Sequence, residues 1–340
     1  MQRNQCNVWV MILLMILIVL MVGGQAVAAK TIRMVAAAPF AKTAQPMAEV
    51  LQDLADTFAK ASGGVIKPQV HWGGSLYKKE AESVKAVSSG SLDCASAGPP
   101  YILEKFESLY GILNLPLLFN DIDHYLRFVS SKAWRQTAIA NLEKKNIKVL
   151  PPTIFMQLAW AGKNPIKGVN DLKGVTMRVL PSPVFVKFVK LSGGKVVTVD
   201  TSELAVALQT GMFDSILMST HVGWMKTFKY LDYMPYCCID PRITTQSADL
   251  TISQSWWKKL PADVRKKCEA ALDGWAERSQ KTVKKFLAED SMNYIKAHGK
   301  PFALDKKAAD EWRTILAPLY EETFKKLGQA ELLDVVNKLR

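Results

Sequence analysis

Two kinds of hydrophobic pattern alternate along residues 30–218. Short apolar runs rich in β-branched residues, typical of strands, are separated by stretches in which apolar residues recur every three or four positions, as in helices. The predicted strands are 31–37, 65–72, 91–98, 147–150, 154–161, 175–180, 195–199 and 212–218. The predicted helices are 46–61, 76–88, 121–145, 183–192 and 201–210. This alternation predicts an α/β fold, and its restart after 151–152 predicts a second unit of similar organisation.

The C-terminal third has a mostly helical pattern. Residues 261–298 carry an apolar stripe without an internal proline, over a length that exceeds an ordinary globular helix. We expect either two helices with a bend near Gly274 or one helix that runs across both units. A last amphipathic helix is predicted over residues 306–327.

The N-terminus has the features of a secretory signal peptide. Arg3 precedes an uninterrupted apolar run at 8–22, and an Ala-x-Ala pattern follows it. The alternative is an uncleaved membrane anchor, for which the run is shorter than the roughly 20 residues a span prefers. We expect cleavage after Ala28 or Ala29, so that residues 1–29 are removed and the mature protein is periplasmic.

The length and charge of the mature chain indicate two lobes and an anionic ligand or partner. About 310 residues are too many for one simple core. We place the first lobe at 30–153 plus about 244–283 and the second at 154–243 plus about 284–340. The formal charge of the whole chain is +13, from 44 basic and 31 acidic residues. This excess favours anionic small molecules or an acidic surface, but not nucleic acid, because the basic residues are scattered along helices.

The cysteines and histidines do not form a recognisable metal site. Cys94, Cys237, Cys238 and Cys268 remain in the mature chain, and we expect mostly buried thiols, since any disulfide would need Cys94 or Cys268. The four histidines lack metal-ligand spacing. No nucleophile elbow, Ser/His/Asp pattern or phosphate-binding loop is present, so the sequence predicts no catalytic site, metal or cofactor.

Arg178 is the main candidate for ligand binding. It interrupts the apolar strand at 175–180, where a buried arginine needs an anionic partner. A carboxylate, held by two parallel hydrogen bonds from the guanidinium, is the partner with the best geometry. The alternative is an arginine at the strand edge that points into water.

Five segments carry a resemblance to a known family. They are 59–66 (AKASGGVI), 90–93 (GSLD), 114–119 (NLPLLF) with 121–124 (DIDH), 171–179 (DLKGVTMRV) and 203–214 (ELAVALQTGMFD). In this order, over the whole mature chain, they resemble the DctP-type periplasmic solute-binding proteins of tripartite ATP-independent periplasmic (TRAP) transporters.

The resemblance implies a two-lobe periplasmic-binding-protein fold, type II-like, with central sheets flanked by helices and a long helix spanning both lobes. It also implies hinge closure on an organic acid, with Arg178 in the position of the family's arginine that pairs with the substrate carboxylate. Glu203 and Asp214 lie in the last matching segment, and we expect structural roles for both. The segment 215–220 lacks the family's frequent asparagine, and the strand 155–160 lacks the second arginine of sialic-acid-type members. These departures make the lining less polar and count against a sugar acid or dicarboxylate.

Further candidate ligand contacts lie near predicted strand ends, where open α/β sheets bind ligands. The aromatic and apolar candidates are Phe40, Trp72, Trp160, Met218 and Trp224, and the hydrogen-bonding candidates are Gln157, Ser182 and Thr220. Each aromatic residue has core or hinge packing as its alternative role. Together they favour a monocarboxylate with an apolar or aromatic body, such as a 2-oxo or 2-hydroxy acid.

The sequence therefore predicts a monomeric binding protein that delivers an organic acid to the membrane permease subunits of a TRAP transporter. One alternative is a periplasmic enzyme on the same fold, with His221 or His71 as a base near Arg178. Another is an exported sensor that presents its ligand to a receptor.

Overall fold

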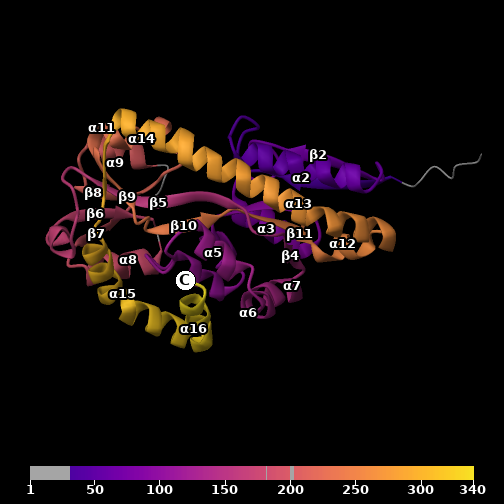
Figure 1. The fold of residues 1–340 in the computed structure, drawn as a ribbon. Helices are drawn as coiled ribbons and strands as arrows, with labels where there is room; N and C mark the ends of the chain where they lie inside the picture. The colour runs from indigo at the N-terminus through magenta and orange to yellow at the C-terminus, as the bar shows by residue number, and fades with distance from the viewer. Residues whose placement is uncertain (1–30, 181, 200–202) are drawn as a thin grey trace, which may run out of the picture.

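The computed structural model describes residues 31–180, 182–199 and 203–340, and shows two sheets side by side (Figure 1). The predicted signal segment and the predicted helix start at 201–202 lie outside these residues. The first sheet has the order β2 (Ile66–His71), β1 (Ile32–Ala37), β3 (Cys94–Gly98), β11 (Asp249–Ser253), β4 (Ile147–Val149). The second has the order β12 (Lys300–Ala303), β9 (Tyr236–Asp240), β5 (Ile154–Gly162), β8 (Ser215–Ser219), β6 (Thr176–Val179), β7 (Lys195–Thr198), and β10 (Thr244–Ser247) pairs with β5.

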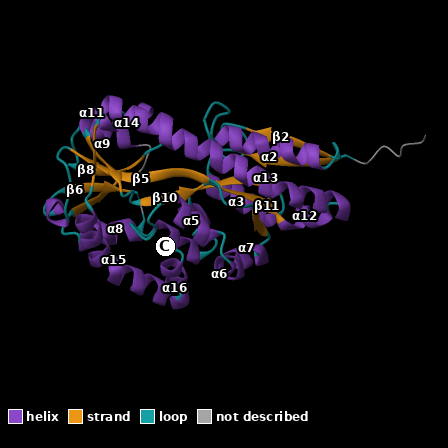
Figure 2. Cartoon of the chain, in the orientation of Figure 1, coloured by secondary structure: helices purple, strands orange, loops and turns teal. Residues whose placement is uncertain are grey.

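Helices flank both sheets, as Figure 2 shows. In the first lobe they are α2 (Met47–Ala61), α3 (Glu80–Ser89), α4 (Pro100–Leu103), α5 (Ile122–Val129), α6 (Lys132–Trp134), α7 (Ala140–Lys144) and α12 (Gln254–Lys259). In the second they are α8 (Pro183–Leu191), α9 (Leu204–Gln209), α10 (Val222–Phe228) and α11 (Tyr230–Tyr233). The helix predicted at 121–145 is divided, because Ser131 starts a new helix by accepting a hydrogen bond from the Trp134 amide.

The chain crosses between the sheets twice near the middle of the molecule. One crossing joins β4 to β5 and the other joins β10 to β11 through Ala248. The first crossing lies between the end of β4 and the start of β5. The second follows β10, which pairs with β5 in the second sheet.

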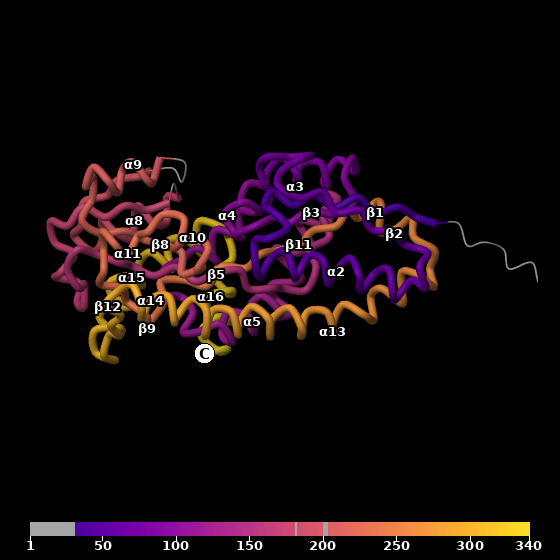
Figure 3. Tube along the Cα trace, turned by 90° about the horizontal axis from the view of Figure 1, so that it is seen from above, coloured from indigo at the N-terminus to yellow at the C-terminus, as the bar shows by residue number. Residues whose placement is uncertain are grey.

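A helical run crosses from one lobe to the other (Figure 3). It consists of α13 (Ala262–Phe286), a π-helical turn (Leu287–Ser291) and α14 (Met292–His298). In the first lobe, the Trp275 indole donates to the Val50 carbonyl of α2 at 3.2 Å, and Arg278 pairs with Asp53 at 3.0 Å. The run is continuous through Gly274, so the single-helix alternative is the one the structure adopts.

The C-terminal helices return to the first lobe. α15 (Lys306–Lys326) passes along the second lobe, and α16 (Ala330–Lys338), which the sequence analysis did not predict, ends against α5. His124 on α5 lies 2.9 Å from the Val336 carbonyl, and Arg127 donates to the Leu339 carbonyl at 2.9 Å. The C-terminal helix α16 therefore contacts α5 of the first lobe. Among the described residues, no helix is both long and apolar enough to cross a membrane.

Candidate ligand-binding site

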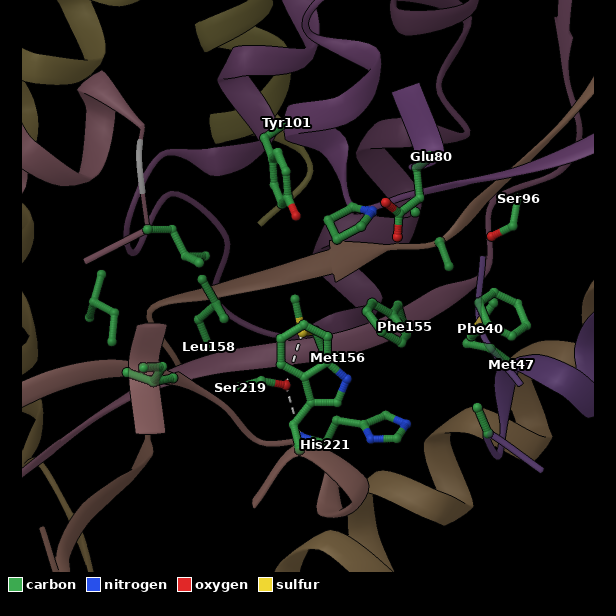
Figure 4. Close-up of a pocket in the computed structure, with 18 of the residues that line it drawn as sticks. Phe40, Met47, Glu80, Ser96, Tyr101, Phe155, Met156, Leu158, Ser219 and His221 are labelled. Carbon is green, nitrogen blue, oxygen red and sulfur yellow. Dashed lines mark hydrogen bonds between the residues drawn. The ribbon is translucent and has the colours of Figure 1, made fainter. Parts of the chain in front are cut away.

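A cavity of about 130 Å³ lies between the two lobes (Figure 4). The first lobe lines it with Phe40, Ala44, Met47, Glu80, Ser96, Gly98, Pro99 and Tyr101. The second lobe lines it with Phe155, Met156, Leu158, Arg178, Leu180, Leu204, Leu217, Ser219, His221, Trp224 and Tyr230, and Ala248 completes the lining at the crossing. Because both lobes contribute, a change in their relative position would open or close the cavity.

Arg178 brings a positive charge to this mostly apolar space. It lies on β6 between β7 and β8, and only 3% of its surface is exposed. Its Nε and Nη2 donate to the Val199 carbonyl at 3.1 and 2.6 Å, which fixes the orientation of the guanidinium. A guanidinium held in this way is pre-organised for a planar anion, and the low-polarity surroundings strengthen the attraction.

Two tyrosines near Arg178 keep their protons at neutral pH. Burial raises the pKa of Tyr101 to about 12 and raises that of Tyr230 further, although the charge of Arg178 acts in the opposite direction on both. Both line the cavity. Each phenol can therefore donate a hydrogen bond to a bound anion as well as accept one.

The first lobe adds two polar side chains to the lining, one from the start of α3 and one from the middle of β3. Glu80 begins α3, and Ser96 is on β3 with 1% of its surface exposed. The Ser96 hydroxyl has no hydrogen-bond partner within the described part of the chain. Figure 4 shows Glu80, Ser96 and Tyr101 together on one side of the cavity.

His221 lines the cavity, and its Nδ1 is engaged in a hydrogen bond. The Nδ1 accepts from the Gly223 amide at 3.2 Å, which assigns the proton of the neutral ring to Nε2. The ring packs between Phe155 and Phe286, with centroids 5.5 and 5.0 Å away. Burial lowers its pKa, so the imidazole is neutral and has no lone pair left for a substrate proton.

Comparison with known proteins decides the family. The model of the family described as bacterial extracellular solute-binding protein, family 7 (DctP), matches residues 37–327. The chain belongs to this family. The predicted resemblance to the DctP-type binding proteins of TRAP transporters is thereby confirmed.

Relatives and solved structures cover nearly the whole of this DctP-family chain. The sialic acid-binding periplasmic protein SiaP of Vibrio cholerae is 24% identical over 286 residues, which is 84% of this chain and 85% of SiaP. A TRAP periplasmic solute-binding protein from Ochrobactrum anthropi, whose C-terminus is bound in its ligand-binding pocket, superposes with a TM-score of 0.83 at 19% identity, covering 92% of this chain and 95% of its own. A Shewanella oneidensis counterpart with bound succinate gives 0.74 at 18% identity, covering 91% and 99%. These structures confirm the predicted two-lobe fold.

Of the predicted ligand contacts in this DctP-family chain, Phe40, Arg178 and Trp224 line the cavity. Trp72 pairs with Phe40, with ring centroids 6.2 Å apart, but is not part of the lining. Trp160 packs on Trp312 of α15 at 5.3 Å and donates to the Ile166 carbonyl at 3.1 Å. The structure thus places Trp160 in the core of the second lobe.

The polar candidates lie beside the cavity rather than on its surface. Thr220 donates from its hydroxyl to the Gln157 carbonyl at 2.9 Å, and the Gln157 amide donates to Thr245 at 3.4 Å. Ser182 is buried at the start of α8, where its hydroxyl has no partner among the described residues. Met218 belongs to a separate core cluster of the second lobe.

Several lining residues that the sequence did not predict are adjacent in sequence to residues that it did predict. Met156 and Leu158 flank Gln157 on β5, and Leu217 and Ser219 flank Met218 on β8. Alternate residues of a strand face opposite sides of the sheet, so Met218 on β8 faces away from the cavity that Leu217 and Ser219 line. The strands were identified correctly, but the side that faces the first lobe was not predictable from either strand alone.

Asp214 and the cysteines have structural surroundings. Asp214 pairs with Lys163 at 3.0 Å and accepts from the Thr176 amide at 3.3 Å, and the hydrogen bond from Lys163 lowers its pKa. Cys94, Cys237, Cys238 and Cys268 are buried thiols outside any disulfide, and burial raises the pKa of each. No cluster of three or more potential metal ligands occurs in the described residues.

Proposed function

We propose that this chain is the periplasmic solute-binding protein of a TRAP transporter and that it captures a small monocarboxylate with an apolar or aromatic body. The supporting observation is the buried Arg178 guanidinium in an otherwise largely apolar cavity between two lobes. A carboxylate can take two parallel hydrogen bonds from such a group, while Phe40, Leu217 and Trp224 surround the rest of the ligand. The signal segment exports the protein, and membrane permease subunits receive the ligand from a monomer.

The volume of the cavity limits the size of the ligand. A cavity of roughly 150 Å³ accommodates benzene, so the 130 Å³ available here suits a small organic acid in this arrangement of the lobes. Sialic acid, which the name of SiaP specifies as its ligand, is several times larger. The size of this cavity therefore supports a short organic acid over a sugar acid.

The charge of the lining argues against a second carboxylate. The Shewanella relative binds succinate, which carries two carboxylates. Among the described lining residues, the side chains of Arg178 and Glu80 have formal charges of opposite sign. A dicarboxylate held by Arg178 would bring its second negative charge toward the Glu80 side of the cavity, which is unfavourable at short range.

Lobe closure supplies the transport mechanism. Ligand contacts from both lobes favour the closed state over the open one, because only the closed state makes all of them. Closure also removes water from the Arg178–carboxylate pair and strengthens it. The permease then recognises the closed form and receives the acid.

The hydrogen bonding of His221 supports a binding function over a catalytic one. The enzyme alternative needs a base beside the bound carboxylate, and His221 is the histidine that lines the cavity among the described residues. Its Nδ1 lone pair already accepts from the Gly223 amide, and the neutral ring carries its proton on Nε2. His71, the other candidate base, lies on β2 outside the lining.

Calorimetric titration of the chain without its predicted signal segment tests this function. We expect a short apolar monocarboxylate to bind, and Arg178→Ala to weaken its binding about 100-fold or more, because it removes one partner of a buried charged pair. Arg178→Lys keeps the charge but loses the planar fork, and we expect an intermediate loss. Arg265→Ala removes an equal charge from α13 and serves as the control.

Two outcomes would overturn the proposal. Retained affinity in Arg178→Ala, with normal folding, would make the arginine structural. Failure of every organic acid to bind the unaltered protein would contradict the binding function itself.

A further inference from the structure

We propose that Glu80 forms a second recognition group opposite Arg178, so that the ligand is a monocarboxylate that also carries a hydrogen-bond donor, either an ammonium or a hydroxyl group. This inference rests on the proposed function and narrows its substrate class to small amino or hydroxy acids. It excludes dicarboxylates and disfavours acids, such as 2-oxo acids, that lack a donor.

The two charged residues belong to different lobes. Arg178 is on β6 of the second lobe and Glu80 is the first residue of α3 in the first lobe, and both line the same cavity. A ligand bonded to both would connect the lobes directly. An acid whose carboxylate bonds to Arg178 and whose hydrogen-bond donor bonds to Glu80 would therefore stabilise the closed state of the lobes.

The Glu80 carboxylate is available for such a bond. It is half-buried, and within residues 31–180, 182–199 and 203–340 it makes no hydrogen bond or ion pair. Gly98 allows it to lie across the end of β3, since a Cβ at Gly98 would be 3.2 Å from the Glu80 Cγ. A carboxylate that is partly desolvated without a partner is unfavourable unless a ligand or water supplies hydrogen bonds.

Ser96 gives independent support for a polar group at this end of the ligand. Its buried hydroxyl lines the cavity and lacks a partner in the described chain. Leaving such a buried hydroxyl without a hydrogen bond is unfavourable. An ammonium group held by Glu80 could also donate to the Ser96 hydroxyl, and a ligand hydroxyl could either donate to it or accept from it.

A simpler role for Glu80 is stabilisation of the α3 N-terminus, where a carboxylate interacts favourably with the helix dipole. Glu82 lies in the same turn and is exposed, so it serves that role as well. The dipole explains a negative charge in this turn. It does not explain why one carboxylate is placed in the cavity beside Tyr101 and Ser96.

Titration calorimetry with four acids of similar size tests the inference. They are valine, 2-hydroxyisovalerate, 2-oxoisovalerate and succinate, and each is titrated into the unaltered protein, Glu80→Gln and Glu82→Gln. We expect valine or 2-hydroxyisovalerate to bind at least about tenfold more tightly than the other two. We expect Glu80→Gln to reduce that preference at least about tenfold while improving succinate binding, and Glu82→Gln to leave all affinities unchanged.

The comparison of valine with 2-hydroxyisovalerate also identifies which group of the ligand donates the hydrogen bond to Glu80. A much larger loss for valine than for 2-hydroxyisovalerate in Glu80→Gln indicates an ammonium group, and a loss confined to 2-hydroxyisovalerate indicates a hydroxyl group. If 2-oxoisovalerate or succinate binds best, or if Glu80→Gln behaves as Glu82→Gln does while Arg178→Ala abolishes binding, the inference is wrong and the proposed function stands. If no acid binds through Arg178, both are wrong.

Discussion

Thr153 and Ala248 lie on the two segments in which the chain passes from one lobe to the other, and two hydrogen bonds connect them. The Thr153 hydroxyl donates to the Ala248 carbonyl at 2.7 Å, and the Ala248 amide donates to the Thr153 carbonyl at 2.9 Å. Both residues are almost completely buried. Since the lobes can rotate only about these crossings and the helices that span them, this pair couples the two points at which the backbone must bend.

Thr153→Val should weaken this connection. Valine keeps the shape of threonine but removes the donor, which leaves the buried Ala248 carbonyl with one bond fewer. We expect the free energy of unfolding to fall by about 1–2 kcal/mol in urea denaturation. Thr314→Val removes an exposed hydroxyl that bonds within α15 and should change it much less. Equal losses in the two variants would show that the bond at the crossing is unimportant.

Asp249, next to this crossing, should make stability depend on pH. It accepts from Ser247 at 3.2 Å, and Ser247 accepts from Tyr125 at 2.8 Å. Burial raises the pKa of Asp249 from 3.8 to about 7. Between these pH values the native state holds a proton that the unfolded chain has lost, so this residue's contribution to stability falls as pH rises through that window.

Asp249→Asn removes this dependence. We expect the variant to match the unaltered protein near pH 4 and to become more stable relative to it toward pH 8, by at most on the order of 4 kcal/mol. Urea denaturation across this range measures the difference. A difference that is constant with pH would mean that Asp249 is ionised in the native state.

His221 should remain neutral below the usual histidine range. Burial lowers its pKa from 6.5, so its contribution to stability is present above pH 6.5 and is lost as pH falls through the lowered value. We expect the ring ¹⁵N NMR signals of His221 to show the Nε2–H tautomer at pH 7 and to titrate below pH 6.5. A pKa at or above 6.5 would contradict the effect of burial, and the Nδ1–H tautomer would contradict the hydrogen bond from the Gly223 amide.

The sequence predicted most strands of the two α/β units because their periodicity and glycine endings are local. Gly90, for example, ends α3 with φ of 79°, a conformation that favours glycine. The strands β9 to β12 were missed. Their pairing is set by distant partners, such as β10 with β5 and β11 with β3, and their short segments carry little pattern of their own.

The candidate site was predicted in part for a related reason. Arg178 was recognisable because a charge inside an apolar strand requires an explanation from local sequence alone. Glu80 gave no such signal, because a glutamate at a helix start is ordinary. Its position in the cavity depends on α3 and β3 meeting β6 across the lobes, which is a tertiary contact.

Leu217 and Met218, neighbours on β8, should separate the effect of cavity size from that of stability. Leu217 lines the cavity, whereas Met218 packs in the core cluster on the other side of the strand. Truncation of either buried side chain to alanine should lower the free energy of unfolding by about 2–5 kcal/mol. Only Leu217→Ala should also enlarge the cavity, and we expect it to shift preference toward acids that are longer by one or two methylene groups. Calorimetric titration with an acid series of increasing length measures this shift. An equal shift in Met218→Ala would mean that the length preference follows general loosening of the second lobe rather than the shape of the cavity.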